Sequence, residues 1–277
     1  MMSASAASPI GIFDSGVGGL SVLRALRQQL PSERAIYVGD QQHVPYGPRP
    51  LVEVRTFSEE ITRFLLARGV KLIVVACNTA SAAALVHLRK TFRSTPFVGM
   101  EPAVKPAAES TLSGVVGVLA TPATFQGELY ASVVERFADG VEVLRSTCPG
   151  LVERIEQGDL SGPGTREILR EALLPMIGRG ADAIVLACTH FPFVIPLISD
   201  ISGPDVRVID PAPAVARQTQ RVLEGRTLVA PTAADNGMEI FTTGSAVEMR
   251  STLPHLLGED LEVQSLRWNG DRLVEES

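Results

Sequence analysis

Two short apolar runs dominate the hydrophobic pattern of this 277-residue chain. Residues 72–76 (LIVVA) and 183–187 (AIVLA) are almost continuously apolar and lack the alternation of a half-exposed strand. Such runs are typical of strands in a parallel sheet that is buried on both faces. Each run follows an Arg-Gly pair and ends at a cysteine, Cys77 or Cys188. The pattern therefore indicates an internal duplication with an offset of 111 residues.

The rest of the hydrophobic pattern alternates short strands with amphipathic helices, which predicts an α/β fold. Leucines spaced along residues 20–30 predict the first helix, which Pro31 ends. The prolines and glycine of residues 43–50 (HVPYGPRP) predict a rigid loop that carries Tyr46 over the edge of the sheet, with a plain surface turn as the alternative. We expect Glu156 near the start of a later loop, where the sequence alone favours a solvated charge. Further strands are expected at residues 10–13, 35–39, 97–100, from 115, 141–144, 206–209, 240–243 and 261–266, and further helices at 57–69, 81–92, 168–177, 211–223 and 246–257.

The duplication predicts two pseudo-symmetric domains, each a mostly parallel sheet flanked by helices, with the active site in the cleft between them. Two prolines punctuate residues 99–107, where we expect the chain to cross to the second domain. Thr121 and Thr124 then follow a strand, as Asp14 and Ser15 do in the first half. The expected domains are residues 1–99 plus 209–277 and residues 100–208, with an exposed connection at 226–237.

The composition narrows the class of partner. A net charge of −6 without any run of Lys or Arg gives no footprint for nucleic acid or an anionic membrane, so a small molecule is expected. The first nine residues lack the features of a signal peptide, and no apolar stretch approaches the roughly 18 residues of a membrane span. Three cysteines without CxxC spacing indicate reduced thiols. We therefore expect a cytoplasmic protein.

A glycine-rich loop, Gly16 to Gly19, follows the first strand and precedes the first helix. Such a loop points backbone N–H groups at an anion, so a bound carboxylate or phosphate is expected. Together with Asp40 it also imitates a dinucleotide site, although Ser21 occupies the third glycine position. A nicotinamide or flavin enzyme is the less favoured interpretation, because it gives the two cysteines no role.

The two thiols are expected at the edge of the sheets where ligands of open α/β folds bind. No metal site is predicted, because the four histidines lack metal-ligand spacing to the cysteines. These histidines are His43, His87, His190 and His255. The remaining chemistry is proton transfer on both faces of one carbon, in which a thiolate removes a proton and the opposite thiol supplies one. Such a reaction inverts a stereocentre without a cofactor.

Each thiol needs a neighbour that sets its protonation state, because a free cysteine is mostly neutral at pH 7. Asp14 is the candidate for Cys77, and His190, two residues from Cys188, is the candidate for the other thiol. The developing carbanion needs hydrogen-bond donors, which Asn78, Thr79 and Thr189 can supply. A duplicated fold with merely structural cysteines remains the alternative at this point.

Six segments, FDSGVGGLSV, DQQHVPYG, VVACNTAS, EPAVKPA, GVLAT and LACTHFP, occur in an order and spacing that resemble the glutamate racemases of the aspartate/glutamate racemase superfamily. The likeness spans residues 10 to about 245. It implies a cofactor-independent enzyme that interconverts L- and D-glutamate and supplies the D-isomer for peptidoglycan. It also implies that Cys77 acts on the D-enantiomer with help from Asp14, and Cys188 on the L-enantiomer with help from His190.

The resemblance adds further site residues. It selects Glu156 as a supporting carboxylate in CPGLVERIEQG, residues 148–158, although Glu153 and Arg154 depart from the family pattern. His43 and Ala187 depart from it too, and Cys148, which has no duplicated counterpart, is expected to be structural. The implied substrate contacts are Asp14, Ser15, Tyr46, Gly47, Asn78, Thr79, Thr189 and His190.

Three alternatives remain beside glutamate racemisation. The nearest is a racemase of the same superfamily that acts on aspartate or a related acid. A single-thiol decarboxylase or isomerase of this fold is disfavoured because both halves keep their cysteine. A non-catalytic, amino-acid-binding regulator belongs to a different class. The resemblance also allows a homodimer.

Overall fold

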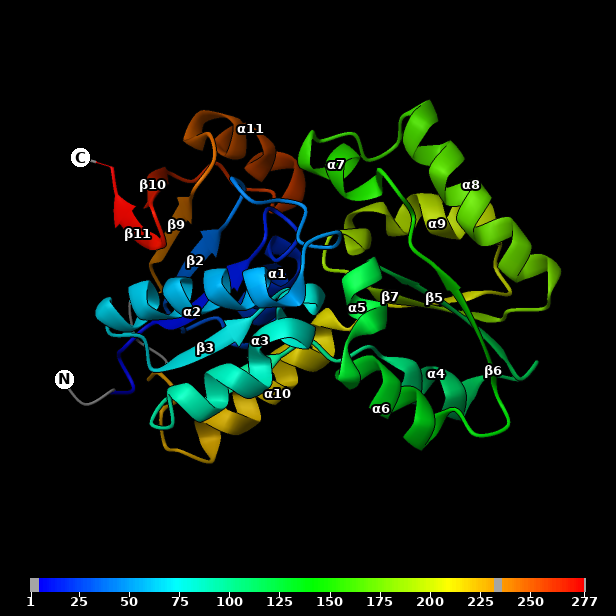
Figure 1. The fold of residues 1–277 in the computed structure, drawn as a ribbon, viewed down its shortest axis with the longest axis horizontal. Helices are drawn as coiled ribbons and strands as arrows, with labels where there is room; N and C mark the ends of the chain where they lie inside the picture. The colour runs from blue at the N-terminus through cyan, green and yellow to red at the C-terminus, as the bar shows by residue number, and fades with distance from the viewer. Residues whose placement is uncertain (1–4, 232–235, 277) are drawn as a thin grey trace.

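The structure, a computed structural model, describes residues 5–231 and 236–276. Its elements form two lobes that lie side by side along the longest axis (Figure 1). The first lobe contains a seven-stranded sheet in the order β11-β10-β9-β2-β1-β3-β4, and the second a four-stranded sheet in the order β6-β5-β7-β8. The strands of the first sheet are β1 (Ile10–Asp14), β2 (Ala35–Gly39), β3 (Leu72–Val75), β4 (Phe97–Gly99), β9 (Met238–Thr242), β10 (Val263–Asn269) and β11 (Arg272–Glu275). Those of the second sheet are β5 (Val115–Ala120), β6 (Glu142–Ser146), β7 (Ala183–Ala187) and β8 (Arg207–Ile209).

The duplication predicted from the sequence is present in the strand order. The run β2-β1-β3-β4 of the first sheet returns as β6-β5-β7-β8 in the second, and all of these neighbours pair in parallel. The strands β3 and β7, which precede Cys77 and Cys188, therefore hold equivalent places. Only the pairing of β10 with the terminal strand β11 is antiparallel among the paired strands of the described residues. The predicted α/β class and its pseudo-symmetry are confirmed.

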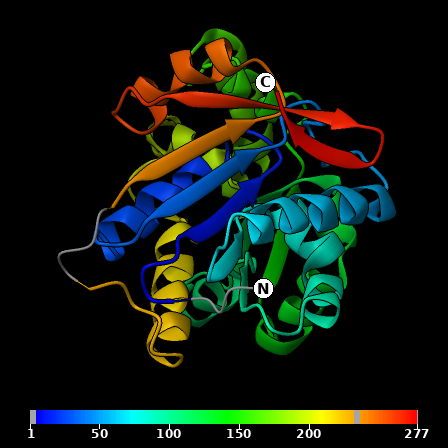
Figure 2. The same cartoon turned by 90° about the vertical axis from the view of Figure 1, so that its left-hand side faces the viewer.

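Helices cover both faces of the first sheet (Figure 2). One face carries α2 (Leu51–Ala67) and α3 (Asn78–Thr91), which pack on each other and on apolar side chains such as Phe13 and Val75. The other face carries α1 (Leu20–Gln29), α10 (Ala212–Glu224) and α11 (Ala246–Leu256). Because α10 follows the last strand of the second sheet and packs against α1, the chain returns to the first lobe there.

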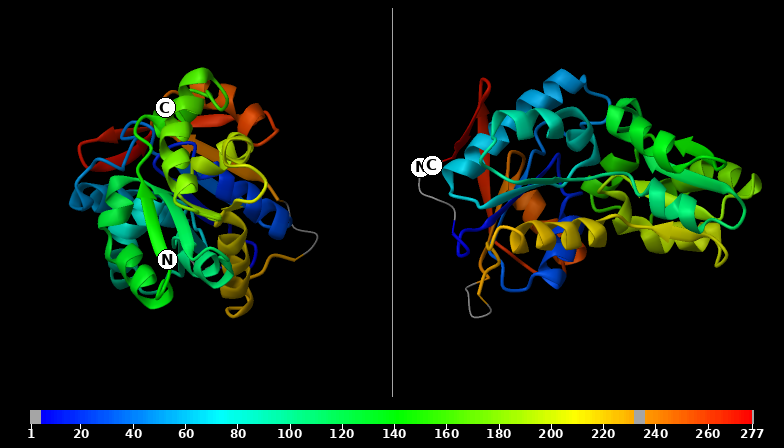
Figure 3. Two further views of the ribbon diagram at one scale, coloured as in Figure 1. Left: turned by 90° about the vertical axis from the view of Figure 1, so that its right-hand side faces the viewer. Right: turned by 90° about the horizontal axis from the view of Figure 1, so that it is seen from below.

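The second sheet is covered in the same way (Figure 3). On one face lie α4 (Val104–Ser110) and α6 (Glu128–Phe137), and on the other α7 (Leu151–Glu156), α8 (Pro163–Gly178) and α9 (Ile195–Ser202). Two short segments, α5 (Pro122–Gln126) and the 3₁₀ turn Phe191–Val194, complete the lobe. One hydrophobic cluster continues from Ile12 in β1 to Leu186 in β7, so the two lobes share apolar packing on that side.

Several local expectations were wrong. The helix expected from Ser81 begins three residues earlier, at Asn78. The Cys77 sulfur accepts the N–H of Ala80 at 3.4 Å and so caps the helix N-terminus. Glu156 was expected as a solvated charge near the start of a loop, but it is the last residue of α7 and only 10% of its side chain is exposed. That helix spans six residues, which is too short to show a period in the sequence. The last predicted strand begins at Val263 instead of residue 261.

The domain boundaries at residues 100 and 209 stay a prediction, which the division of strands between the two sheets supports. The expected connection at 226–237 lies partly outside the described residues. In the described part of the chain, none of the helices combines the length and the apolar character of a membrane span.

Candidate active site

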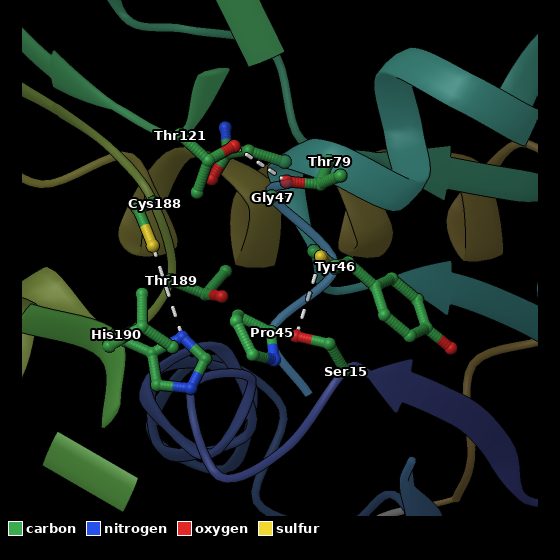
Figure 4. A pocket seen from close by; sticks show the side chains of 12 residues that line it. Ser15, Pro45, Tyr46, Gly47, Thr79, Thr121, Cys188, Thr189 and His190 are labelled. Carbon is green, nitrogen blue, oxygen red and sulfur yellow. Dashed lines mark hydrogen bonds between the residues drawn. The ribbon is translucent and has the colours of Figure 1, made fainter. Parts of the chain in front are cut away.

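Twelve side chains or backbone segments from both lobes line one pocket (Figure 4). Cys188 and His190 lie on one side of it in the close-up, and Ser15 and Tyr46 on the other. The cavity between them measures about 10 Å³, roughly the room that one water molecule needs. An amino acid therefore enters only if the surrounding groups move apart. The lining residues are Ser15, Pro45, Tyr46, Gly47, Cys77, Asn78, Thr79, Thr121, Val152, Cys188, Thr189 and His190.

The first thiol, Cys77, lies between the end of β3 and the start of α3. It donates a hydrogen bond to the Ser15 hydroxyl over 4.0 Å and accepts the N–H of Ala80. Burial raises the pKa of Cys77 well above its ordinary value, and the nearby charge of Asp14 raises it further. The thiol is therefore neutral in this closed arrangement.

Asp14 ends β1 and is completely buried. Its Oδ2 accepts the N–H of Gly16 at 3.1 Å, and its Oδ1 accepts the Thr189 hydroxyl at 3.1 Å. Burial raises the pKa of the Asp14 carboxyl, although the charge of His190 opposes the rise. Asp14 therefore lies behind the pocket, where its charge acts on Cys77 and its oxygens join the first lobe to the strand end of the second.

The second thiol, Cys188, follows β7 and begins a chain of polar contacts. Its sulfur lies 3.8 Å from Nδ1 of His190, and Nε2 of His190 lies 2.6 Å from Oε1 of Glu156. Burial by itself would lower the pKa of His190, but the contacts with Cys188 and Glu156 outweigh it and raise that pKa well above the ordinary value. The structure thus places His190, which the sequence paired with Cys188, beside that thiol, and adds Glu156, which the resemblance gave only as a supporting carboxylate.

The glycine-rich loop holds an anion, as its pattern predicts, but the anion is the chain's own Glu156. The Val17 N–H donates to Oε1 of Glu156 at 2.7 Å. A Cβ on Gly16 would lie 1.9 Å from Oε1 of Glu156, and one on Gly18 would lie 2.4 Å from Nδ1 of His190. The loop needs glycine because these side chains of the second lobe fill the space beside it.

The Glu156 carboxylate is held on both oxygens. Gln41 donates its side-chain N–H to Oε2 at 2.8 Å, while Oε1 receives Val17 and His190. Burial acts to raise the pKa of Glu156, but the hydrogen bonds from His190, Gln41 and Val17 and the charge of His190 outweigh it and lower that pKa. A carboxylate that stays ionised beside His190 favours the imidazolium form.

The loop after β2 carries Tyr46 and Gly47 to the pocket, as the proline pattern predicted. The Tyr46 hydroxyl donates to Oδ2 of Asp40 at 2.7 Å, and burial raises the pKa of this tyrosine well above its ordinary value. A Cβ on Gly47 would lie 2.8 Å from Cβ of Thr121, so this position requires glycine for the close approach of the lobes.

The dinucleotide interpretation does not fit this geometry. Besides Tyr46, the buried Asp40 carboxylate accepts the Thr243 hydroxyl at 2.7 Å and the Trp268 indole N–H at 2.8 Å, which leaves it no free oxygen for a ribose. Glu156 and His190 occupy the space that a pyrophosphate would need at the loop. Among the described residues there is also no cluster of three or more His, Cys, Asp or Glu side chains that could hold a metal ion.

The substrate contacts implied by the resemblance line the pocket, apart from Asp14, which supports it from behind. Both polar atoms of the buried Asn78 amide find no hydrogen-bond partner among the described residues. The sequence interpretation missed Thr121, whose hydroxyl contacts Thr79 across the lobes at 2.8 Å. Its place directly after β5, which corresponds to that of Asp14 at the end of β1, was the available signal. Two residues that depart from the family pattern are also placed: His43 contacts Asp40 and stacks on Phe57, and Ala187 is buried in β7.

The model of the Asp/Glu/hydantoin racemase family matches residues 10–219. The chain is 48% identical to a glutamate racemase of Roseiflexus sp. strain RS-1 over 256 residues, covering 92% of this chain and 94% of that protein. The glutamate racemase of Francisella tularensis, solved with D-glutamate, superposes with a TM-score of 0.81 at 30% identity and covers 94% and 97% of the two chains. The Escherichia coli glutamate racemase, solved with L-glutamate and the activator UDP-MurNAc-Ala, superposes with a TM-score of 0.82 at 32% identity and covers 95% and 100%. Together with the paired thiols in one interlobe pocket, these matches establish that the chain belongs to the Asp/Glu/hydantoin racemase family.

Proposed function

We propose that this enzyme interconverts L- and D-glutamate without a cofactor, using Cys77 and Cys188 as bases on opposite faces of the substrate α-carbon. The observation that carries the proposal is that both thiols, each after an equivalent strand of a duplicated fold, line the same small pocket. The glutamate racemases that resemble the chain over most of its length support the choice of substrate.

In the direction from L to D, the Cys188 thiolate removes the α-proton. The raised pKa of His190 provides an imidazolium beside the sulfur, which stabilises the thiolate. Glu156 keeps His190 charged and fixes its ring by contacting the other nitrogen. The polar chain therefore prepares Cys188 as the base for the L-enantiomer.

Cys77 supplies a proton to the opposite face. Because burial keeps this thiol neutral, it is suited to donate to the carbanion. After the transfer, Cys188 is a thiol and Cys77 a thiolate, which is the form that removes the proton from D-glutamate. Asp14, whose charge acts on Cys77, assists the return of the proton to that sulfur. The two directions thus use the same pair of groups in opposite protonation states.

The polar lining suits an amino acid with two carboxylates. The unpaired amide of Asn78 and the hydroxyls of Ser15, Thr79, Thr121 and Thr189 offer donors to the carboxylates and to the enolate formed in the reaction. Asn78 and Thr79 also form the first turn of α3, a 14-residue helix whose N-terminal N–H groups favour an anion.

The expected biological role is to supply D-glutamate for peptidoglycan. Restored growth of a bacterium that requires D-glutamate would support this role, and failure of an active enzyme to restore growth would contradict it. A cytoplasmic location and a homodimer stay predictions.

The catalytic test follows the α-hydrogen of each glutamate enantiomer in D₂O. At low conversion, we expect the inverted product to carry deuterium while the remaining substrate keeps protium, because each face has its own thiol. Equal labelling of both would contradict two separate bases, and no inversion would contradict racemisation. Aspartate, tested in parallel, should turn over more slowly; faster turnover would assign the site to aspartate. Binding of glutamate without turnover would instead indicate a regulator.

A further inference from the structure

Gln41 connects the two lobes at the back of the candidate active site. It follows Asp40 in the loop after β2 of the first lobe. Its Nε2 donates to Oε2 of Glu156, at the end of α7 in the second lobe, over 2.8 Å. Its Oε1 accepts the hydroxyl of Thr242, the last residue of β9, over 2.7 Å. One amide thus joins the central sheet of the first lobe to the carboxylate behind His190.

The hydrogen-bond pattern determines which end of the Gln41 amide faces Glu156. The Glu156 carboxylate, whose lowered pKa keeps it ionised, can only accept hydrogen bonds, while the Thr242 hydroxyl can donate to the carbonyl of Gln41. The NH₂ group must then face the carboxylate. Packing also restricts the side chain, since a Cβ on Gly244 would lie 2.7 Å from Cβ of Gln41.

The contact sets the orientation of the Glu156 carboxylate. Oε1 receives both the Val17 N–H and the His190 ring, while the donor on Oε2 is Gln41. Without Gln41, Oε2 loses this donor and the carboxylate is held through its Oε1 contacts, so its plane is less tightly fixed relative to Nε2 of His190. Because Val17 and Gln41 both belong to the first lobe, Glu156 is fully held only when the lobes are closed.

We infer that Gln41 is a positioning residue for the proton transfer at Cys188: it orients Glu156, which in turn holds His190 against the thiol, and it does so across the lobe interface. The inference rests on the proposed two-base function. It concerns one side of the substrate, since Gln41 acts through the chain that ends at Cys188 and makes no contact in the Ser15–Cys77 pair.

Ordinary steady-state rates cannot reveal this asymmetry. The two enantiomers have equal free energy in water, so kcat/KM must fall by the same factor in both directions in any variant. Isotope effects can distinguish the two sides. If transfer at Cys188 becomes slower, the α-deuterium effect on kcat/KM increases for L-glutamate, whose proton Cys188 removes. The α-deuterium effect on kcat/KM for D-glutamate decreases toward the equilibrium isotope effect on transfer of its α-hydrogen to Cys77.

The experiment compares wild type with Gln41→Leu, and with Gln42→Leu as the matched control, because the neighbouring Gln42 is exposed. We expect Gln41→Leu to lower kcat/KM about tenfold, as for loss of one hydrogen bond to a charged group. The two isotope effects should move in opposite directions, and Gln42→Leu should behave as wild type. Equal changes in both isotope effects, or unchanged activity in Gln41→Leu, would overturn the inference.

A second pair of variants tests the inference independently, in case Gln41→Leu does not fold. Thr242→Val keeps Gln41 but removes the hydroxyl that orients its amide, whereas Thr242→Ser keeps that hydroxyl. We expect Thr242→Val to shift the isotope effects in the same sense as Gln41→Leu, and Thr242→Ser to restore the wild-type values. Identical behaviour of the two Thr242 variants would overturn the inference. Absence of racemisation by wild type would instead refute the proposed function itself.

Discussion

The hydroxyl oxygens of Thr79 and Thr121 lie 2.8 Å apart, although Thr79 belongs to the first turn of α3 and Thr121 precedes α5 in the other lobe. Thr124 continues this contact, with its hydroxyl 2.9 Å from that of Thr121. Substrate must separate the pair or replace it with its own polar groups. The pair is part of the closed interface, and we propose that it is also part of the binding surface.

Replacing Thr121 with Val should raise KM for both glutamate enantiomers about tenfold, because one hydroxyl that can bind the substrate is lost. Thr121 also caps α5, so the free energy of unfolding should fall by about 1 kcal/mol. Thr121→Ser keeps the hydroxyl and should retain the wild-type KM. The initial rate of racemisation, followed by circular dichroism, measures the effect. Equal KM values for the Val and Ser variants would contradict a binding role.

Asp40 anchors the loop that carries Tyr46. In Asp40→Asn, one carboxylate oxygen becomes an NH₂ group that must face a donor among Tyr46, Thr243 and Trp268. We expect a loss of about 2–3 kcal/mol in unfolding free energy and a higher KM. Trp268 is the single tryptophan, so its fluorescence reports the change directly. The exposed Asp271→Asn is the control, and an unchanged emission spectrum in Asp40→Asn would contradict the anchoring role.

The pair of His190 and Glu156 predicts a pH dependence of stability. His190 has a raised pKa, so its stabilising contribution is complete below the ordinary value of 6.5 and is lost as the pH rises through the folded-state value. Glu156 has a lowered pKa, so its contribution is present above 4.5 and is lost as the pH falls through its folded-state value. The unfolding free energy of wild type, measured with urea, should therefore exceed that of Glu156→Gln by most between pH 4.5 and pH 6.5, and the difference should shrink above pH 6.5. A difference that grows from pH 6.5 to pH 9 would contradict the assignment.

Cys148 should be structural. Burial raises its pKa to about 12, so it is a neutral thiol at physiological pH. Cys148→Ala should leave kcat and KM unchanged while lowering the unfolding free energy by about 1–2 kcal/mol, because a small buried apolar group is removed. Urea unfolding and the racemisation assay measure the two quantities. Loss of activity at unchanged stability would assign Cys148 a role in the reaction.

The sequence predicted the features that repeat or that depend on local pattern. The apolar runs before Cys77 and Cys188 became equivalent strands, and the proline-rich loop brought Tyr46 to the pocket. The sequence could not show that Glu156 would fill the glycine-rich loop, because this contact joins residues 139 positions apart. The role of Gln41 depends on a similar contact, with Glu156 115 positions away, for which no local pattern exists.

In the proposed mechanism both thiols move protons on one substrate carbon, so the rates of racemisation in Cys77→Ser and Cys188→Ser are the decisive measurement. Each rate is measured by circular dichroism from both enantiomers, with thermal unfolding as the control for an intact fold. We expect racemisation to be almost abolished in each variant while the unfolding temperature stays near that of wild type. Full activity in either variant would remove that thiol from the mechanism and refute the use of two bases.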